Sequence, residues 1–218
     1  MIQVKICGIT NIEDAVCAAE CGAAAAGFIF YPPSLRYIQP NKARAIIDKL
    51  PRDLVKVGVF VNEPAAEVKR IFDYCGLDML QLHGEESPDY CRQFPSLCVI
   101  KALELKNEED VQAASCYDVA AILADSRCAG LYGGTGKISN WDLAGKVSQR
   151  LILSGGLNEG NIMKALQKVN PAALDINSGT EERPGKKDSA KIVRIMQVIK
   201  TGDAGGHRPL IFVKRKET

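Results

Sequence analysis

The stretch Gln3-Val4-Lys5-Ile6-Cys7-Gly8, at the start of the chain, has the pattern of a short strand that ends in a tight turn. By strand alternation Lys5 and Cys7 share one face, whereas Val4 and Ile6 share the other. Such a strand packs its apolar face against helices and presents the lysine and the thiol to an interior. A thiol at the C-terminal tip of a strand is where α/β folds place reactive groups. A free cysteine is more often a small buried hydrophobe, so both interpretations of Cys7 stand at this point.

The same alternation of strand and helix continues along the chain. Short apolar runs rich in β-branched residues predict strands at 2–7, 25–30, 54–60, 78–82, 97–103, 119–124, 150–154 and 172–176. The stretches between them predict helices near 12–21, 41–50, 63–75, 86–94, 107–116, 140–148, 158–168 and 187–200. Several strands, such as Ala24–Phe30 and Ala120–Leu123, are apolar on both faces, which is typical of parallel strands covered by helices.

Eight β-then-α units in 218 residues predict an α/β fold, a single (β/α)8 TIM barrel in which a parallel eight-stranded barrel is surrounded by helices. The alternative is an open doubly wound sheet, which normally carries a GxGxxG turn after its first strand; Cys7–Asn11 lacks that pattern. No linker divides the chain, so residues 1–200 are expected to form one catalytic domain. Residues 201–218 are expected to form a flexible or loosely docked tail, with an oligomer contact or a lid as the alternative.

Composition limits the partners and the location. The chain carries 28 basic and 26 acidic residues, a formal charge of +2, which predicts no nucleic-acid partner. No apolar run approaches the ~20 residues that a membrane helix needs, and the N-terminus lacks a signal-peptide pattern. The eight cysteines form no CxxC pair, and with only two histidines no ligand set for a metal is recognisable. Scattered thiols suggest a reducing compartment, so we expect a cytoplasmic protein.

In a (β/α)8 barrel the strand tips and the loops after them form the active face. Asp125 closes the apolar strand that precedes it, where a carboxylate is a helix cap, a solvated loop residue, or a general acid whose pKa partial desolvation raises. The strands that carry Cys7 and Asp125 lie three apart around an eight-stranded ring. Their inward side chains are therefore expected to face each other across its mouth, as an acid–base pair with a small molecule between them.

Two glycine-bearing turns, Ser154-Gly155-Gly156 and Asn177-Ser178-Gly179, follow the last two strands. Glycine lets the backbone approach an oxyanion closely, and helix N-termini supply free N–H donors. The loops after strands seven and eight often hold a phosphate in barrels of this kind. A third anion-friendly segment, Gly133–Lys137, lacks the full P-loop spacing. The predicted phosphate-binding residues are Gly134, Gly155, Gly156, Ser178 and Gly179.

Four further residues are candidates for substrate binding. Arg36, in a proline-stiffened loop after the second strand, has the shape to bind a carboxylate bidentately, although a surface arginine is the default. His83 closes the fourth strand, where a structural hydrogen bond is as plausible as a catalytic part. Asp175 points inward and must meet a partner, substrate or water, and a purely structural pairing with Lys5 is one alternative. Lys5 is also expected to lower the pKa of the Cys7 thiol.

Motifs at the strand tips occur in a characteristic order: Lys5–Thr10, Gly27–Phe30, Ser34–Ile38, Val57–Asn62, Gln81–Glu85, Gly133–Lys137, Leu153–Leu157, Asp175–Gly179 and Pro184–Asp188. With these motifs, residues 1–200 resemble the phosphoribosylanthranilate isomerase family. The resemblance implies a metal- and cofactor-free Amadori rearrangement of N-(5-phosphoribosyl)anthranilate to 1-(2-carboxyphenylamino)-1-deoxyribulose 5-phosphate, in tryptophan biosynthesis. It places the general base on Cys7, the general acid on Asp125 and the contact with the anthranilate carboxylate on Arg36. The tail lies outside the resemblance.

Other function classes remain as rivals. A sister phosphate-binding barrel, the aminoimidazole isomerase of histidine biosynthesis, uses two aspartates, and Cys7 at the first-strand position argues against it as the main activity. A non-catalytic phosphate-ligand binder would need neither Cys7 nor Asp125. A thiol-redox role lacks a resolving cysteine at motif spacing. The expected partner is a small phosphorylated substrate, and the chain is expected to be a monomer or a homodimer.

Overall fold

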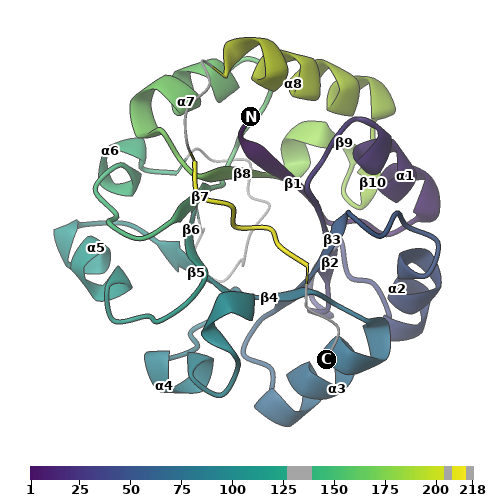
Figure 1. Ribbon diagram of the computed structural model, residues 1–218, viewed down its shortest axis with the longest axis horizontal. Helices are drawn as coiled ribbons and strands as arrows, with labels where there is room; N and C mark the ends of the chain where they lie inside the picture. The colour runs from purple at the N-terminus through teal and green to yellow at the C-terminus, as the bar shows by residue number, and fades with distance from the viewer. Residues whose placement is uncertain (127–138, 204–207, 215–218) are drawn as a thin grey trace.

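The computed structural model describes residues 1–126, 139–203 and 208–214, which form a closed barrel of eight parallel strands. Each strand pairs with its sequence neighbours, and β1 pairs with β8 to close the ring (Figure 1). The strands are β1 (Gln3–Cys7), β2 (Ala25–Ile29), β3 (Val55–Phe60), β4 (Met79–Leu82), β5 (Val99–Glu104), β6 (Ala121–Asp125), β7 (Leu151–Leu153) and β8 (Ala173–Ile176). The predicted barrel is confirmed, with every strand within two residues of its expected bounds.

Helices surround the barrel (Figure 1): α1 (Ile12–Glu20), α2 (Pro40–Ile47), α3 (Ala65–Cys75), α4 (Pro88–Cys91), α5 (Glu108–Ala114), α6 (Trp141–Ala144), α7 (Ile162–Val169) and α8 (Ser189–Gly202). Most are a few residues shorter than predicted, and α4 and α6 are less than half the predicted length. α4 ends at its C-cap Arg92, and Pro95 beyond it has no N–H group with which to extend the helix. α6 ends at its cap Gly145, since glycine is a poor helix former. Among the described residues, no helix is long and apolar enough to cross a membrane.

A short hairpin between β8 and α8 was not predicted. It consists of β9 (Glu181–Arg183) and β10 (Lys186–Lys187), joined by a turn at Pro184–Gly185 in which Gly185 has a φ of 79°. The Pro-Gly pair is a recognisable turn signal, but the strands on either side are charged and too short to show an apolar alternation. The hairpin follows the 3-10 turn η2 (Ser178–Thr180) and lies at the C-terminal ends of the barrel strands.

Strand alternation divides the apolar core into two layers. Outward-facing residues such as Ile6 and Phe60 pack against the helices. Inward-facing residues such as Val57 and Met79 fill the barrel, and Val57 pairs with Gly27 on one side and with Met79 on the other. Apolar side chains fill this interior. The polar residues at the C-terminal ends of the strands lie at the rim of the barrel, where barrels of this class carry their active sites.

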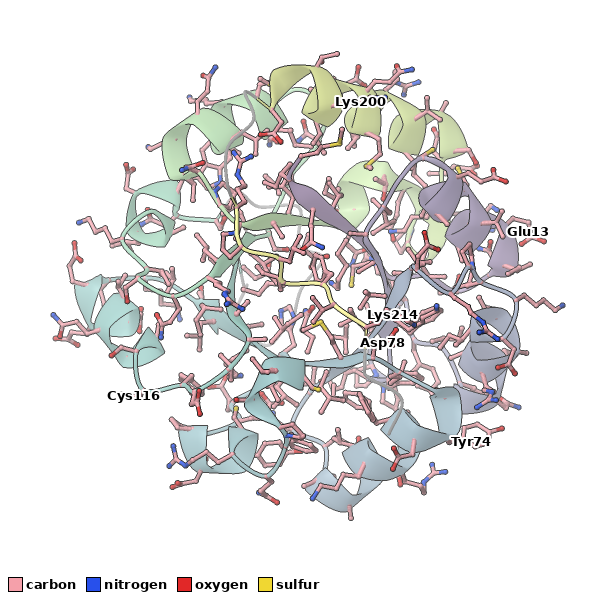
Figure 2. All side chains as sticks on the ribbon, in the orientation of Figure 1. Glu13, Tyr74, Asp78, Cys116, Lys200 and Lys214 are labelled. Atoms are coloured by element: carbon pink, nitrogen blue, oxygen red, sulfur yellow. The ribbon has the colours of Figure 1, made fainter. Side chains whose placement is uncertain are left out.

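Residues 208–214 lie across the opposite, N-terminal mouth of the barrel (Figure 1). Ile211 and Phe212 are 1% and 4% exposed and pack against the inner apolar layer. The Gln3 side chain accepts hydrogen bonds from the backbone N–H groups of both residues and donates one to the Phe212 carbonyl. Figure 2 shows Lys214 beside Asp78, and the two form an ion pair at 2.9 Å. This short segment therefore covers the end of the barrel away from the predicted site.

Replacing Phe212 by alanine is expected to lower the stability of the protein. Truncating a buried aromatic side chain typically costs 3–5 kcal/mol; we expect about 2 kcal/mol here, because a terminal segment can detach on its own. For a chain of this size that loss corresponds to a decrease in Tm of roughly 4–8 °C in a thermal unfolding scan. Leu210→Ala is the matched control, since Leu210 is 64% exposed. Equal Tm values for the two variants would contradict a stabilising role for the buried ring.

Candidate functional site

A cleft opens at the C-terminal ends of the strands. Its volume is about 670 Å³, including the part that is open to solvent. Most of the predicted site residues line it: Cys7, Arg36, His83, Asp125, Gly155, Gly156, Asp175 and Ser178. Lys5 and Gly179 do not line the cleft, and Gly134 lies outside the described residues. The cleft is therefore lined by residues from seven of the eight strand ends or the loops after them.

The Cys7 thiol ends β1 and lies against the backbone of β2. A Cβ atom on Gly27 would come within 2.7 Å of Cys7 Sγ, so glycine at this position leaves the room that the thiol occupies. Burial raises the pKa of the thiol, Lys5 lowers it, Asp175 raises it and Lys187 lowers it; the net shift is upward. The contribution of Lys5 has the predicted sign, but the expectation of a lowered pKa is wrong because burial outweighs the ammonium groups.

Lys5 forms a buried ion pair behind the thiol. Its Nζ donates to Asp175 Oδ1 at 2.6 Å, and the two side chains are 0% and 4% exposed. The register of β1 against β8 places these two residues directly opposite each other. Burial disfavours the ammonium form, but the negative charges of Asp175 and Cys7 and their hydrogen bonds together outweigh burial and raise the pKa of Lys5 above its ordinary value. Lys5 therefore stays charged under Cys7, and of the pair only Asp175 reaches the cleft.

Asp125 ends β6 and is approached from β4 by a chain of hydrogen bonds. His83 Nε2 lies 3.0 Å from Asp125 Oδ2, and His83 Nδ1 lies 2.7 Å from Gln81 Nε2. All three side chains are buried, with Gln81 the most enclosed. The sequence pattern singled out His83 and Asp125 but missed Gln81. Gln81 precedes His83 by two residues and therefore lies on the same face of the strand, which could have indicated that it belongs to the site.

The loops after β7 and β8 form one wall of the cleft. Gly155 and Gly156 have φ values of 87° and 62°, a backbone conformation that favours glycine. Gly179 has a different role, because a Cβ atom at this position would come within 2.0 Å of the Leu157 carbonyl oxygen. Glycine at 179 thus lets the loop after β8 pack against the loop after β7. Of the predicted phosphate-binding residues, Gly155, Gly156 and Ser178 face the cleft and Gly179 supports the wall from behind.

Arg36 reaches the cleft from the loop after β2, but its guanidinium already holds a carboxylate of the protein. Arg36 Nε and Nη2 donate to the two carboxylate oxygens of Glu181, at 2.8 and 2.7 Å. Lys187 Nζ lies 3.3 Å from the same carboxylate and also donates to the backbone and side-chain oxygens of Asn177, at 3.0 Å each. Glu181 and Lys187 were missed by the sequence analysis because they belong to the unpredicted hairpin.

Replacing Glu181 by alanine is expected to destabilise the fold by about 3–5 kcal/mol, because two buried cations lose their carboxylate partner. The measurement is the free energy of unfolding in urea. Glu182→Ala is the matched control, since Glu182 is the exposed neighbour on the same strand and its loss is expected to stay within about 0.5 kcal/mol. A Glu181→Ala variant as stable as this control would show that the cluster contributes nothing to folding.

The same carboxylate gives stability a pH dependence. Burial raises the pKa of Glu181, but the hydrogen bond from Arg36 and the charge of Lys187 outweigh burial and lower it. A carboxyl group with a lowered folded-state pKa contributes stability that is complete above the unfolded pKa and is lost as the pH falls through the folded one. The wild-type protein is therefore expected to lose stability below about pH 4.3, and Glu181→Gln to lose less over that range in urea titrations.

The site can perform acid–base chemistry on a ligand with an anionic end. The strand that carries Cys7 and the strand that carries Asp125 are separated by β7 and β8, whose loops form the glycine-lined wall. A ligand whose anion sits on that wall extends between the thiol and the carboxyl group. In the parts of the chain described here, no cluster of three or more His, Cys, Asp or Glu side chains has the geometry to hold a metal ion.

Comparison with known proteins identifies the family to which this site belongs. Residues 4–198 match the model of the family described as N-(5'phosphoribosyl)anthranilate (PRA) isomerase. The chain is 50% identical over 202 residues to an N-(5'-phosphoribosyl)anthranilate isomerase of Syntrophus aciditrophicus, an alignment that covers 92% of this chain and 88% of the relative.

Solved structures give the same result. The crystal structure of phosphoribosyl anthranilate isomerase from Thermotoga maritima superposes with a TM-score of 0.84 at 41% identity, covering 92% of this chain and all of that one. A structure of such an isomerase in complex with reduced 1-(o-carboxyphenylamino)-1-deoxyribulose 5-phosphate superposes with a TM-score of 0.82, at the same identity and coverage.

Proposed function

The chain belongs to the family of N-(5'-phosphoribosyl)anthranilate isomerases, and we propose that it performs the family's reaction with Cys7 as the general base and Asp125 as the general acid. It is an isomerase of tryptophan biosynthesis, which converts N-(5'-phosphoribosyl)anthranilate to 1-(2-carboxyphenylamino)-1-deoxyribulose 5-phosphate. The observation that carries the assignment of roles is the placement of Cys7 and Asp125 on one cleft, with the glycine-lined wall on the two strands between them.

The chemistry needs one proton donor and one proton acceptor. Asp125 gives its proton to the ring oxygen of the ribose, and the bond between that oxygen and C1 breaks as the anilino nitrogen forms an iminium with C1. The iminium withdraws electrons from C2, so its hydrogen becomes acidic enough for a thiolate to remove. Cys7 takes that proton, and the resulting enolamine tautomerises to the ketone. Neither step needs an oxidant or a second reactant.

The two charged ends of the substrate fix its orientation. We assign the phosphate to the wall formed by Gly155, Gly156 and Ser178, where positive-φ glycines expose backbone to the cleft. Arg36 lines the cleft from the loop after β2, two strands round the ring from β8, and we assign the anthranilate carboxylate to it. Because Glu181 already occupies two donors of Arg36, the substrate carboxylate would use the remaining N–H groups of the guanidinium.

The location and assembly state are also proposals. The seven cysteines among the described residues are all free, which supports a reducing compartment, and we propose a cytoplasmic location. We propose that the chain is a monomer or a homodimer; light scattering on purified protein distinguishes the two. The phosphoribosylanthranilate isomerase from Thermotoga maritima is described as dimeric, and a structure of monomers generated from it is 41% identical to this chain.

A fluorescence assay of the purified chain tests the activity. The anthranilate group of the substrate is fluorescent, and consumption of N-(5'-phosphoribosyl)anthranilate is followed as a loss of that signal. The result expected is a loss well above the rate without protein, and competitive inhibition by the reduced product analogue. No loss above background would turn the assignment toward the aminoimidazole isomerase of histidine biosynthesis, which the same preparation can be tested for.

A further inference from the structure

The chain of hydrogen bonds from Gln81 to Asp125 contains a buried polar atom without a partner. Gln81 is 1% exposed, and among the described residues its Oε1 is one of few buried side-chain atoms that have no hydrogen-bond partner. A buried acceptor left unpaired is destabilising, and a residue such as methionine would fill the same space without that penalty. A glutamine at this position therefore points to a use for the other atom of its amide, the Nε2 that lies 2.7 Å from His83 Nδ1.

The orientation of this amide decides where the histidine proton sits. With Nε2 donating to His83 Nδ1, that ring nitrogen is an acceptor and the proton of the neutral ring is on Nε2. With the amide reversed, the ring proton would be on Nδ1 and an NH2 group would be left buried without a partner. Unpaired buried N–H groups are rarer in proteins than unpaired carbonyl oxygens, so the first orientation is favoured.

We propose that Gln81 is a positioning residue for the acid: it holds His83 in the Nε2–H form, so that His83 donates to Asp125 Oδ2 and the acid's proton is confined to the other carboxyl oxygen. In the reversed arrangement Asp125 would donate to His83, and its proton would lie between the two side chains rather than toward the ligand. This inference rests on the proposed role of Asp125 as the acid. No group is consumed; the chain only sets the direction of one hydrogen bond.

The first experiment reads the proton position directly. Two-bond 15N–1H correlation spectra of the purified protein show which ring nitrogen of each histidine carries a proton. The chain has one other histidine, His207, and a His207→Gln variant assigns the signals. The proposal expects the proton of His83 on Nε2. A proton on Nδ1 in the wild-type protein overturns it. Because this measurement needs neither substrate nor a variant at Gln81, it stands even if the proposed function fails.

The second experiment changes the amide. Gln81→Glu keeps the shape but replaces the donor by a carboxylate, which accepts from Nδ1–H and reverses the chain; Gln81→Met removes both polar atoms. Gln112→Glu, at an exposed position, is the charge-matched control. We expect Gln81→Glu to move the His83 proton to Nδ1 and to lower kcat by about tenfold or more, with KM changed far less, and Gln81→Met to lie between it and the control.

Two outcomes contradict the proposal at this stage. If Gln81→Glu moves the proton and kcat is unchanged, the tautomer does not matter to the acid. If the loss of kcat follows a loss of Tm in both variants while the proton stays on Nε2, Gln81 has only a packing role. An Asp125→Asn variant with full turnover would instead show that the proposed acid is wrong, which leaves the spectroscopic result on His83 intact.

Discussion

Cys7→Ser is expected to turn over substrate at least about a hundredfold more slowly than the wild-type chain, because a positioned general base contributes 10²–10⁴-fold. A serine hydroxyl is a much weaker acid than a thiol, so it supplies even less of the anion that a general base needs, although burial raises the pKa of the Cys7 thiol. The exchange of sulfur for oxygen hardly changes the side-chain volume, so the pocket beside Gly27 is kept. The fluorescence assay at saturating substrate gives the loss in kcat, and thermal unfolding shows that the variant is folded.

The control for this variant is a second cysteine that has no part in the cleft. Cys116 is exposed, and Cys116→Ser is expected to leave both kcat and Tm unchanged. A general effect of thiol removal would appear in both variants, whereas loss of the base appears only at Cys7. Undiminished turnover by Cys7→Ser would remove the thiol from the mechanism. The proton on C2 would then have to go to another group on the cleft wall, and among the described residues Asp175 is the other carboxylate there besides Asp125.

The barrel could be predicted because its signal is repeated. Each strand buries both faces, so apolar β-branched runs recur eight times, and a single misjudged boundary does not change the topology. The errors occur where a local signal competes with that rhythm. The helix predicted at 86–94 extends past Arg92, the C-cap of α4, and the helix predicted at 140–148 extends past Gly145, the C-cap of α6. The hairpin β9–β10 has no apolar alternation at all, because its strands are held by hydrogen bonds and ion pairs instead.

The sequence predicted which residues lie at the site, from their positions at strand ends, but it did not predict which charged side chains pair there. The positions of Cys7 and Asp125 at strand tips placed both on the cleft, since every strand of a closed barrel ends at the same rim. Which charges meet depends on contacts between segments far apart in the chain. Arg36 and Glu181 are 145 residues apart, and no local pattern shows that they form a buried pair. The predicted direction of the pKa shift at Cys7 was wrong for a similar reason, because the sequence shows Lys5 but does not show how deeply the thiol is buried.

Asp125→Asn is expected to lower kcat by about 10²–10⁴-fold, because an amide cannot give a proton to the ring oxygen of the ribose. Asparagine has nearly the same size and its carbonyl oxygen still accepts from His83, so the hydrogen bond at 3.0 Å and the fold are expected to survive. KM should change far less than kcat, since the phosphate wall is untouched. Asp118→Asn, at an exposed position before β6, is the matched control and is expected to behave as the wild-type chain.

The pH dependence of the residual activity of Asp125→Asn distinguishes loss of the acid from loss of the base. In Asp125→Asn the thiol of Cys7 is the member of the pair that still titrates, and burial raises its pKa. The residual rate should therefore increase with pH, up to about tenfold per unit, until the thiol is ionised. The wild-type rate should not follow this profile, because it depends on a proton donor as well as on the thiolate. Equal slopes in the two profiles would show that the proton reaching the ring oxygen does not come from Asp125.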